Sequence, residues 1–303
     1  MIIDIHAHLG DICFPGGGAL IEKTGVRKKA GLDVISISEF FLHPWTQQVK
    51  FGGWLHRQDL RASMARNLSA TRENFRRSMD AAGVSRSVAL PVPPHVGFSD
   101  LQAAAQKDPA IIPFTGVDFS REYDVATALA AEVAAGAKGM KLHPILQREK
   151  LTSPRTFAAM EAFAPHQLPV LIHTGICYYY PQAKDRFREE PGFADLHEVA
   201  ALVKAFPQVK FIAGHAGLTQ AKSAMTLLGG FHNVWVEGSF QSPQTLRELI
   251  RTFGPENVLF GSDWPWGNRI PAVKIMKQAC SGDQALEKRV LYQNAAELMN
   301  LSI

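Results

Sequence analysis

The strongest constraint on the fold is a repeated alternation of short apolar runs with segments that have helical patterns. The apolar runs predict eight strands, at residues 2–9, 87–92, 111–117, 138–143, 170–173, 209–213, 234–237 and 258–261. Helices are predicted at residues 71–82, 99–107, 123–135, 153–165, 196–206, 219–228 and 243–253, with further helices up to residue 300. Strands that alternate with helices pair in parallel through right-handed crossovers. The pattern predicts an α/β fold, a (β/α)8 TIM barrel, with an open doubly wound sheet as the alternative.

Length and composition fit one globular domain over residues 1–303. The chain is 46% hydrophobic and 20% charged, and barrels of this size are often single domains. Its net charge of +4 is spread along the chain, so we expect neither a nucleic-acid nor a membrane-surface partner. No run approaches the roughly 20 apolar residues of a spanning helix, and few, scattered cysteines suit a reducing compartment. We therefore expect a cytoplasmic protein.

One segment, residues 10–67, interrupts the alternation directly after the first strand. It reads as irregular and is too long for an ordinary connection, so a functional lid is favoured over a simple loop. Its aromatic residues favour a packed, lid-like insertion over disorder, which is poor in such residues. They are Phe40, Phe41, Trp45, Phe51 and Trp54. Such a segment could equally cover a neighbouring copy in a homodimer.

Chemically useful side chains gather where the predicted strands end. In chain order these are His6 and His8, Lys141 and His143, His173, His215, Glu237, and Asp263. Five of the chain's eleven histidines fall at these positions. The carboxyl ends of barrel strands carry the active site in this architecture, whereas an open sheet gives no reason for polar residues at so many strand ends.

Imidazoles and a carboxylate at one end of a barrel suit a divalent metal ion. Alternate residues of a strand share a face, so Asp4, His6 and His8 should project together. The favoured ligands, which leave room for a bound water, are His6, His8, His173 and Asp263. Zn²⁺ fits this set best, with Mn²⁺ or Fe²⁺ as alternatives. His215 lies outside the set and is a candidate for orienting substrate or moving a proton.

Aromatic and basic residues follow the fifth and eighth strands. Of these, Tyr178, Trp264 and Arg269 are our candidates for contact with substrate. Aromatic walls with a few cations suit a small, flat or apolar molecule that carries an anionic group. The alternative is that these side chains only pack the long segment against the barrel.

The motifs at the strand ends resemble those of the amidohydrolase superfamily. They are DIHAHL (4–9), KGMKLHP (138–144), VLIHTG (170–175), IAGHAG (212–217) and FGSDWPW (260–266). The chain is most similar to the amidohydrolase-related branch that includes aminocarboxymuconate semialdehyde decarboxylase and the resorcylate decarboxylases. The resemblance implies a metal-bearing barrel in which His6, His8, His173 and Asp263 match ligands. It also implies that His215 polarises the substrate or handles protons, and that Asp263 takes a proton from bound water.

The same resemblance leaves two questions open. Members with two metals carry a carboxylated lysine near the position of Lys141. The neighbouring His143, however, belongs to a form typical of the branch with one metal, where the lysine contacts a substrate anion or is a salt-bridged core residue. We predict that Lys141 and His143 contact substrate. The reaction is either hydrolysis of an ester, lactone or amide, which we favour, or decarboxylation or hydration of a carboxylated aromatic or unsaturated acid. A barrel that binds a ligand without metal or catalysis is the third hypothesis.

Overall fold

The computed structural model describes residues 1–29, 31–33, 36 and 54–302. The strands in this part of the chain are β1 (Ile3–Asp4), β2 (Arg86–Ala89), β3 (Ile111–Pro113), β4 (Thr115–Gly116), β5 (Met140–Leu142), β6 (Val170–His173), β7 (Phe211–Gly214), β8 (Val234–Glu237) and β9 (Val258–Leu259). All paired strands are parallel, in the orders β1-β2-β3 and β4-β5-β6-β7-β8-β9. Every pair therefore joins two strands that follow one another along the chain, and of these strands only β3 and β4 are consecutive without pairing.

Backbone hydrogen bonds join these two sheets into a closed barrel. β3 and β4 are separated only by Phe114, whose N–H donates to the carbonyl oxygen of Ala89 at 3.1 Å. At the other seam, the N–H of Ile5 donates to Phe260 O at 2.9 Å, and the N–H of Asp263 donates to His6 O at 2.8 Å. With β3 and β4 counted as one interrupted strand, eight strands close on themselves. The predicted (β/α)8 TIM barrel is confirmed.

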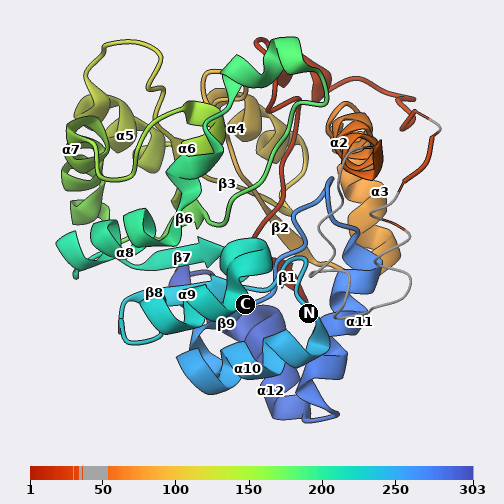
Figure 1. The fold of residues 1–303 in the computed structure, drawn as a ribbon, viewed down its shortest axis with the longest axis vertical. Coiled ribbons are helices and arrows are strands. Elements are labelled where there is room, and N and C mark those ends of the chain that lie inside the picture. The colour runs from red at the N-terminus through yellow and green to blue at the C-terminus, as the bar shows by residue number, and fades with distance from the viewer. Residues whose placement is uncertain (30, 34–35, 37–53, 303) are drawn as a thin grey trace.

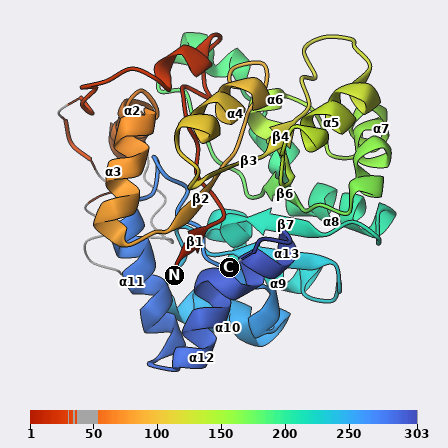
Figure 2. The same cartoon turned by 180° about the vertical axis from the view of Figure 1, so that it is seen from behind.

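Helices surround the strands, as Figures 1 and 2 show from opposite sides. Those described are α2 (Trp54–Asn67), α3 (Arg72–Ala82), α4 (Phe98–Lys107), α5 (Val125–Ala134), α6 (Pro144–Gln147), α7 (Pro154–Phe163), α8 (Leu196–Ala205), α9 (Ala221–Leu228), α10 (Pro243–Phe253), α11 (Arg269–Cys280), α12 (Gln284–Lys288) and α13 (Asn294–Leu298). Hydroxyl and carboxylate side chains cap several of them, such as Thr71 before α3 and Ser153 before α7. Among the described residues, no helix is long and apolar enough to cross a membrane.

Helix α2 differs from the sequence prediction, which has residues 10–67 as irregular. Its apolar residues do not recur on one face, so the sequence lacks the usual sign of a packed helix. The end of α2 is instead tied down by polar contacts: Asn67 Nδ2 donates to Asp11 Oδ1, and Asn67 Oδ1 accepts from the N–H of Ile12. Phe40, Phe41, Trp45 and Phe51, which favoured a packed lid, lie outside the described residues.

Two apolar clusters hold the barrel. One contains alternate residues of the strands, such as Ile3, Val88 and Leu171, together with residues of α13. The other contains the intervening strand residues, such as Val170 and Ile172, together with helix residues. Because successive strand side chains point to opposite faces, the first cluster fills the barrel interior and the second lies between strands and helices. α13 therefore covers one end of the barrel, and the N and C termini lie close together (Figures 1 and 2).

Asp4 does not share a direction with His6 and His8, contrary to the sequence expectation. Regular pairing in the first strand ends at Asp4, so strict alternation does not continue into the histidines. Arg269 Nε donates to Asp4 Oδ2 at 2.8 Å, and both side chains are fully buried. The guanidinium also donates to Ser87 Oγ and Phe75 O, and lies over the ring of Phe75. Arg269 thus links β1 and β2 to α3 and α11.

We expect Arg269→Met to lower the free energy of unfolding by about 3–5 kcal/mol, because it leaves the Asp4 carboxylate buried without its cation. Denaturant unfolding followed by circular dichroism measures this loss. A matched control is Arg289→Met, which removes a partly exposed ion pair with Glu297. That change should cost at most about 1 kcal/mol. Equal losses in the two variants would contradict a structural role specific to Arg269.

Candidate active site

The candidate site lies at the carboxyl end of the barrel strands, where several backbones adopt an unusual conformation. His215, Phe240 and Asp263 have φ angles of 60°, 62° and 54°, although none is glycine. Such left-handed residues cluster at functional sites, where surrounding contacts hold them in place.

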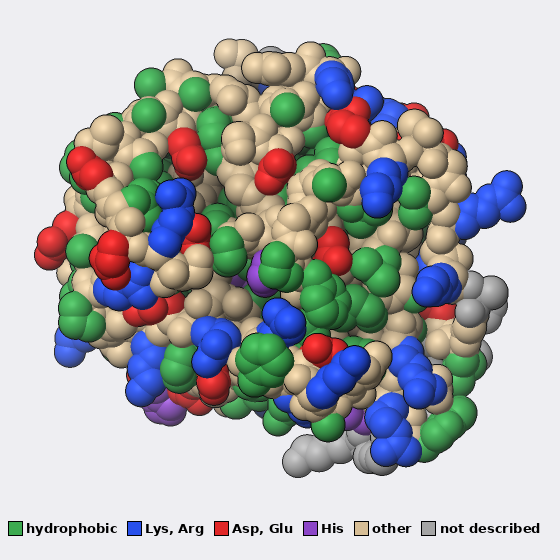
Figure 3. Space-filling model, turned by 90° about the horizontal axis from the view of Figure 1, so that it is seen from above, with side chains coloured by type: hydrophobic (Ala, Val, Ile, Leu, Met, Phe, Trp, Pro, Cys, Tyr) green, Lys and Arg blue, Asp and Glu red, His purple; other side chains and the backbone are tan. Residues whose placement is uncertain are grey.

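Close packing beside the site requires glycine at position 261. A Cβ there would lie 2.3 Å from Glu237 Oε2 and 3.1 Å from His6 Cβ, so only glycine leaves room. Figure 3 shows a histidine among hydrophobic side chains near the centre of one face.

His6 and His8 each have one ring nitrogen engaged and the other directed at Asp263. His6 Nδ1 donates to Glu237 Oε1 at 2.7 Å, and His8 Nδ1 donates to Leu90 O at 3.0 Å. Their Nε2 atoms lie 3.4 Å and 3.6 Å from Asp263 Oδ1. Hydrogen bonding at Nδ1 fixes the tautomer in which Nε2 carries a free lone pair. Two imidazoles and one carboxylate therefore present ligand atoms to a common space.

The structure also brings His215 into this group. Ligand atoms of His6, His215 and Asp263 all lie within 4.8 Å of one another, and all three residues are buried. His173, in contrast, is one ring further away: its Nδ1 lies 3.0 Å from His215 Nε2, and its Nε2 donates to Gly175 O at 3.2 Å. Of the four predicted ligands, the structure thus places His6, His8 and Asp263 together, with His173 adjacent through His215.

Glu237 connects the two parts of the site. Its Oε1 accepts from His6 Nδ1, from the N–H of His215 and from Ser239 Oγ, and its Oε2 accepts from the N–H of Ser239. Ser239 Oγ in turn lies 2.6 Å from His215 Nδ1. One fully buried carboxylate therefore orients both His6 and His215. A carboxylate behind a metal-binding histidine is a common arrangement that raises the basicity of the ligand.

Burial shapes the charges of the site. It lowers the pKa values of all five strand-end histidines below the ordinary range, so the imidazoles are neutral, as metal ligands must be. Burial also lowers the pKa of Lys141, whose Nζ lies 3.2 Å from His6 Nε2, to about 7. It raises the pKa of Asp263 well above its usual value. Because an ionised carboxylate is costly here, a divalent cation beside Asp263 fits the site.

The predicted substrate contacts are only partly brought to the site. Trp264 packs edge-on against Phe75, next to buried Arg269, and so lies on the outer side of the barrel wall. Tyr178 is 43% exposed, and its ring contacts His56 and Arg186. Lys141 and His143 do lie among the histidines.

Two aromatic residues near Trp264 and Tyr178 in the sequence, Trp266 and Tyr179, contact the histidines of the site instead. The ring of Trp266 meets His8 at 5.4 Å and Tyr179 at 6.1 Å, both edge-on. Tyr179 Oη lies 3.0 Å from His143 Nε2 and 3.4 Å from His173 Nδ1. Tyr179 lies among Tyr178–Tyr180, and Trp266 lies two residues after Trp264, but residue type alone does not say which of these side chains faces the site. The direction depends on the turn that each loop makes after its strand.

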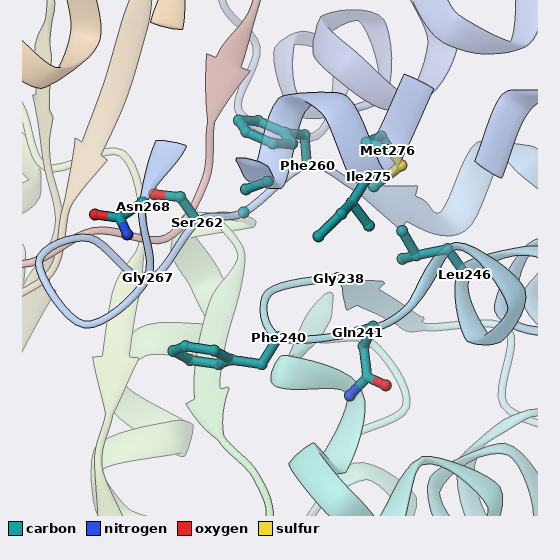
Figure 4. Close-up of a pocket in the computed structure, with 12 residues that line it drawn as sticks. Gly238, Phe240, Gln241, Leu246, Phe260, Ser262, Gly267, Asn268, Ile275 and Met276 are labelled. Carbon is teal, nitrogen blue, oxygen red and sulfur yellow. The ribbon is translucent and has the colours of Figure 1, made fainter. Parts of the chain in front are cut away.

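A small, mostly apolar cavity of about 30 Å³ lies behind the site, between the segment after β8 and helix α11 (Figure 4). Leu246, Ile275 and Met276 line it on the side of α10 and α11. On the other side, Gln241 donates to His215 O at 2.7 Å. A cavity of this size has room for about one or two water molecules and is too small for a substrate.

Comparison with known proteins agrees with this geometry. The model of a family described as amidohydrolase matches residues 3–301. No curated protein matches the sequence significantly.

Solved structures share the fold over almost the full chain at low identity. A 5-carboxyvanillate decarboxylase from Sphingomonas paucimobilis is 17% identical, covers 99% of both chains and has a TM-score of 0.64. A putative 2-pyrone-4,6-dicarboxylic acid hydrolase from Pseudomonas putida is 18% identical, covers 100% of this chain and 98% of its own, and has a TM-score of 0.60. A 2,6-dihydroxybenzoate decarboxylase from Rhizobium is 15% identical, covers 99% and 98%, and has a TM-score of 0.62. At these identities the similarity shows the fold.

Proposed function

The chain belongs to the amidohydrolase family, and from this premise we propose that it is a metal-dependent hydrolase of a small, flat ester, lactone or amide that carries an anionic group. The observation that carries the proposal is the position of Asp263 Oδ1, 3.4 Å and 3.6 Å from the Nε2 atoms of His6 and His8. A carboxylate next to ligand nitrogens is placed to remove a proton from an attacking water.

A bound divalent ion, most simply one Zn²⁺ with Mn²⁺ or Fe²⁺ as alternatives, would supply Lewis acidity and lower the pKa of a water molecule. We propose His6, His8, His173 and Asp263 as its ligands. Asp263 then accepts the proton of the attacking water, and His215 polarises the substrate carbonyl. Lys141, buried beside His6, attracts the anionic group of the substrate, and Trp266 supplies a flat wall beside His8.

Decarboxylation of a carboxylated aromatic acid is the second candidate, because the structural neighbours include decarboxylases as well as pyrone dicarboxylate hydrolases. Solved structures with the same fold include proteins named as 5-carboxyvanillate and 2,6-dihydroxybenzoate decarboxylases, one of them determined with manganese. The fold alone does not choose a reaction, because the chemistry depends on the site and its loops. In this reaction the same imidazoles and Lys141 would hold the carboxylate and a neighbouring oxygen of the substrate.

A panel of substrates separates the two reactions. The metal-loaded protein is assayed with 2-pyrone-4,6-dicarboxylate and simple aryl esters for ring or ester opening. It is also assayed with 5-carboxyvanillate and 2,6-dihydroxybenzoate for release of CO₂. We expect turnover of a lactone or ester, abolished by a chelator and restored by Zn²⁺ or Mn²⁺. Release of CO₂ without any hydrolysis would replace the first proposal with the second.

A further inference from the structure

Tyr179 is held from three directions at the mouth of the site. Its N–H donates to Glu189 Oε2 at 2.7 Å, which fixes the backbone of the loop after β6. Its ring meets Trp266 edge-on, with centroids 6.1 Å apart. Its hydroxyl oxygen lies 3.0 Å from His143 Nε2. The residue as a whole is half-buried, between the buried site residues and the surface.

The ring of His143 is engaged on each side, so little of it is left to contact substrate. Its Nδ1 accepts from the N–H of Leu146 at 3.4 Å and so caps helix α6. Its ring is stacked on that of His173, with centroids 4.4 Å apart and an angle of 13° between the planes. A neutral imidazole that accepts at Nδ1 carries its proton on Nε2. His143 therefore donates its remaining proton to the oxygen of Tyr179.

The Tyr179 hydroxyl then needs an acceptor for its own proton. The hydroxyl has two acceptors within reach. One is the sulfur of Cys177, and the other is His173 Nδ1 at 3.4 Å, which is already 3.0 Å from His215 Nε2. Hydroxyl groups normally donate to oxygen at about 2.7–2.8 Å, and a cysteine sulfur is a weak acceptor. Both contacts are therefore weak, and exchanging them for a substrate oxygen costs little.

From this arrangement we infer that Tyr179 donates a hydrogen bond to an oxygen of the bound substrate, and that His143 is the residue that orients it. The inference rests on the proposed function. It narrows the substrate class to planar acids that have a carboxylate or phenolate oxygen on the side of the molecule that faces Tyr179, away from the metal ligands. Trp266 lies beside both Tyr179 and His8, so a flat ring next to it would place such an oxygen within reach of the hydroxyl.

The test compares Tyr179→Phe with Tyr178→Phe and Tyr292→Phe in the metal-loaded protein. Each change removes one hydroxyl and keeps the ring, so folding should be preserved. Tyr292 packs against the cluster that α13 covers and serves as the remote control. We expect Tyr179→Phe to raise KM about 10- to 100-fold for the substrate found in the panel, with kcat changed much less. The dissociation constant of 2,6-dihydroxybenzoate, measured by calorimetry, should rise by a similar factor, while the metal content is unchanged.

Each outcome distinguishes the inference from the proposed function. If the wild type turns over a panel member but Tyr179→Phe stays within twofold of its KM, the inference is wrong and the proposed function stands. If Tyr178→Phe alone raises KM, the sequence-based assignment of Tyr178 was right and that of Tyr179 is rejected. If the wild type neither turns over the panel nor binds 2,6-dihydroxybenzoate, the proposed substrate class is wrong and the inference is rejected with it.

Discussion

The purified protein is expected to contain about one equivalent of a divalent metal, and His6→Ala/His8→Ala less than about a tenth of one. Both imidazoles have Nδ1 engaged and Nε2 directed at Asp263, so removing them deletes two of the ligand atoms that the fold has already oriented. Hydrolytic activity should fall to background in the double variant. Metal analysis by mass spectrometry and thermal melting of both proteins separate loss of metal from loss of fold.

A milder change should weaken metal binding without abolishing it. Glu237→Gln keeps every ligand but weakens the acceptor that orients His6 and His215, and should lower metal affinity about 10- to 100-fold. Unchanged affinity would show that Glu237 serves packing alone. About two equivalents in the wild type would instead support the arrangement with two ions, in which Lys141 bridges them and His215 binds the second. A metal-free, folded wild type that cannot be loaded would favour the hypothesis of a barrel that binds without metal.

The barrel and the strand-end histidines could be predicted from the sequence because both depend on local patterns. A run such as VLIH (170–173) is short, apolar and followed by a polar residue, so it marks a buried strand and its exit. The parallel pairing of β6 with β5 and β7 then brings His173 near Lys141 and His215. Here the periodicity and the fold lead to the same assignment.

The directions of individual side chains could not be predicted, because they depend on loop geometry beyond the strands. The sequence places Asp4 two residues before His6, yet Asp4 binds Arg269 and Ser262 while His6 turns to Glu237. Likewise, one residue separates Trp264, which packs on Phe75, from Trp266, which meets His8. Side chains alternate between the two faces of a strand only while the strand stays regular. At the end of the barrel that carries the site, the strands lose this regularity.

Helix α2 shows a different limit. Its side chains, such as Arg66 and Asn67, attach it to the site through polar contacts: Arg66 donates to the carbonyl oxygens of Pro265 and Trp266, and pairs with Asp33 at 3.0 Å. Hydrophobic periodicity cannot detect a helix that is held in this way. These contacts connect residues 54–67 with the loop that carries Asp263, which keeps the prediction of a lid-like insertion worth testing.

The replacement Asp263→Asn should lower kcat about 10²- to 10⁴-fold at saturating metal, which is the usual contribution of a general base. Asn adopts left-handed backbone conformations readily, so the φ of 54° at this position should survive the change. The amide keeps an oxygen near His6 and His8 but cannot accept a proton from water. The measurement is kcat at a metal concentration that restores full occupancy, with bound metal determined on the same sample.

The control for this change is Asp283→Asn. Asp283 caps α12 by accepting from the N–H groups of Ala285 and Leu286, a role that asparagine fills equally well. That variant should keep wild-type kcat and stability. If Asp263→Asn with full metal keeps wild-type turnover, Asp263 is not the base, and His215, which has a ring nitrogen within 4.8 Å of the ligand atoms of His6 and Asp263, becomes the next candidate. If turnover is lost only together with the metal, Asp263 acts as a ligand alone.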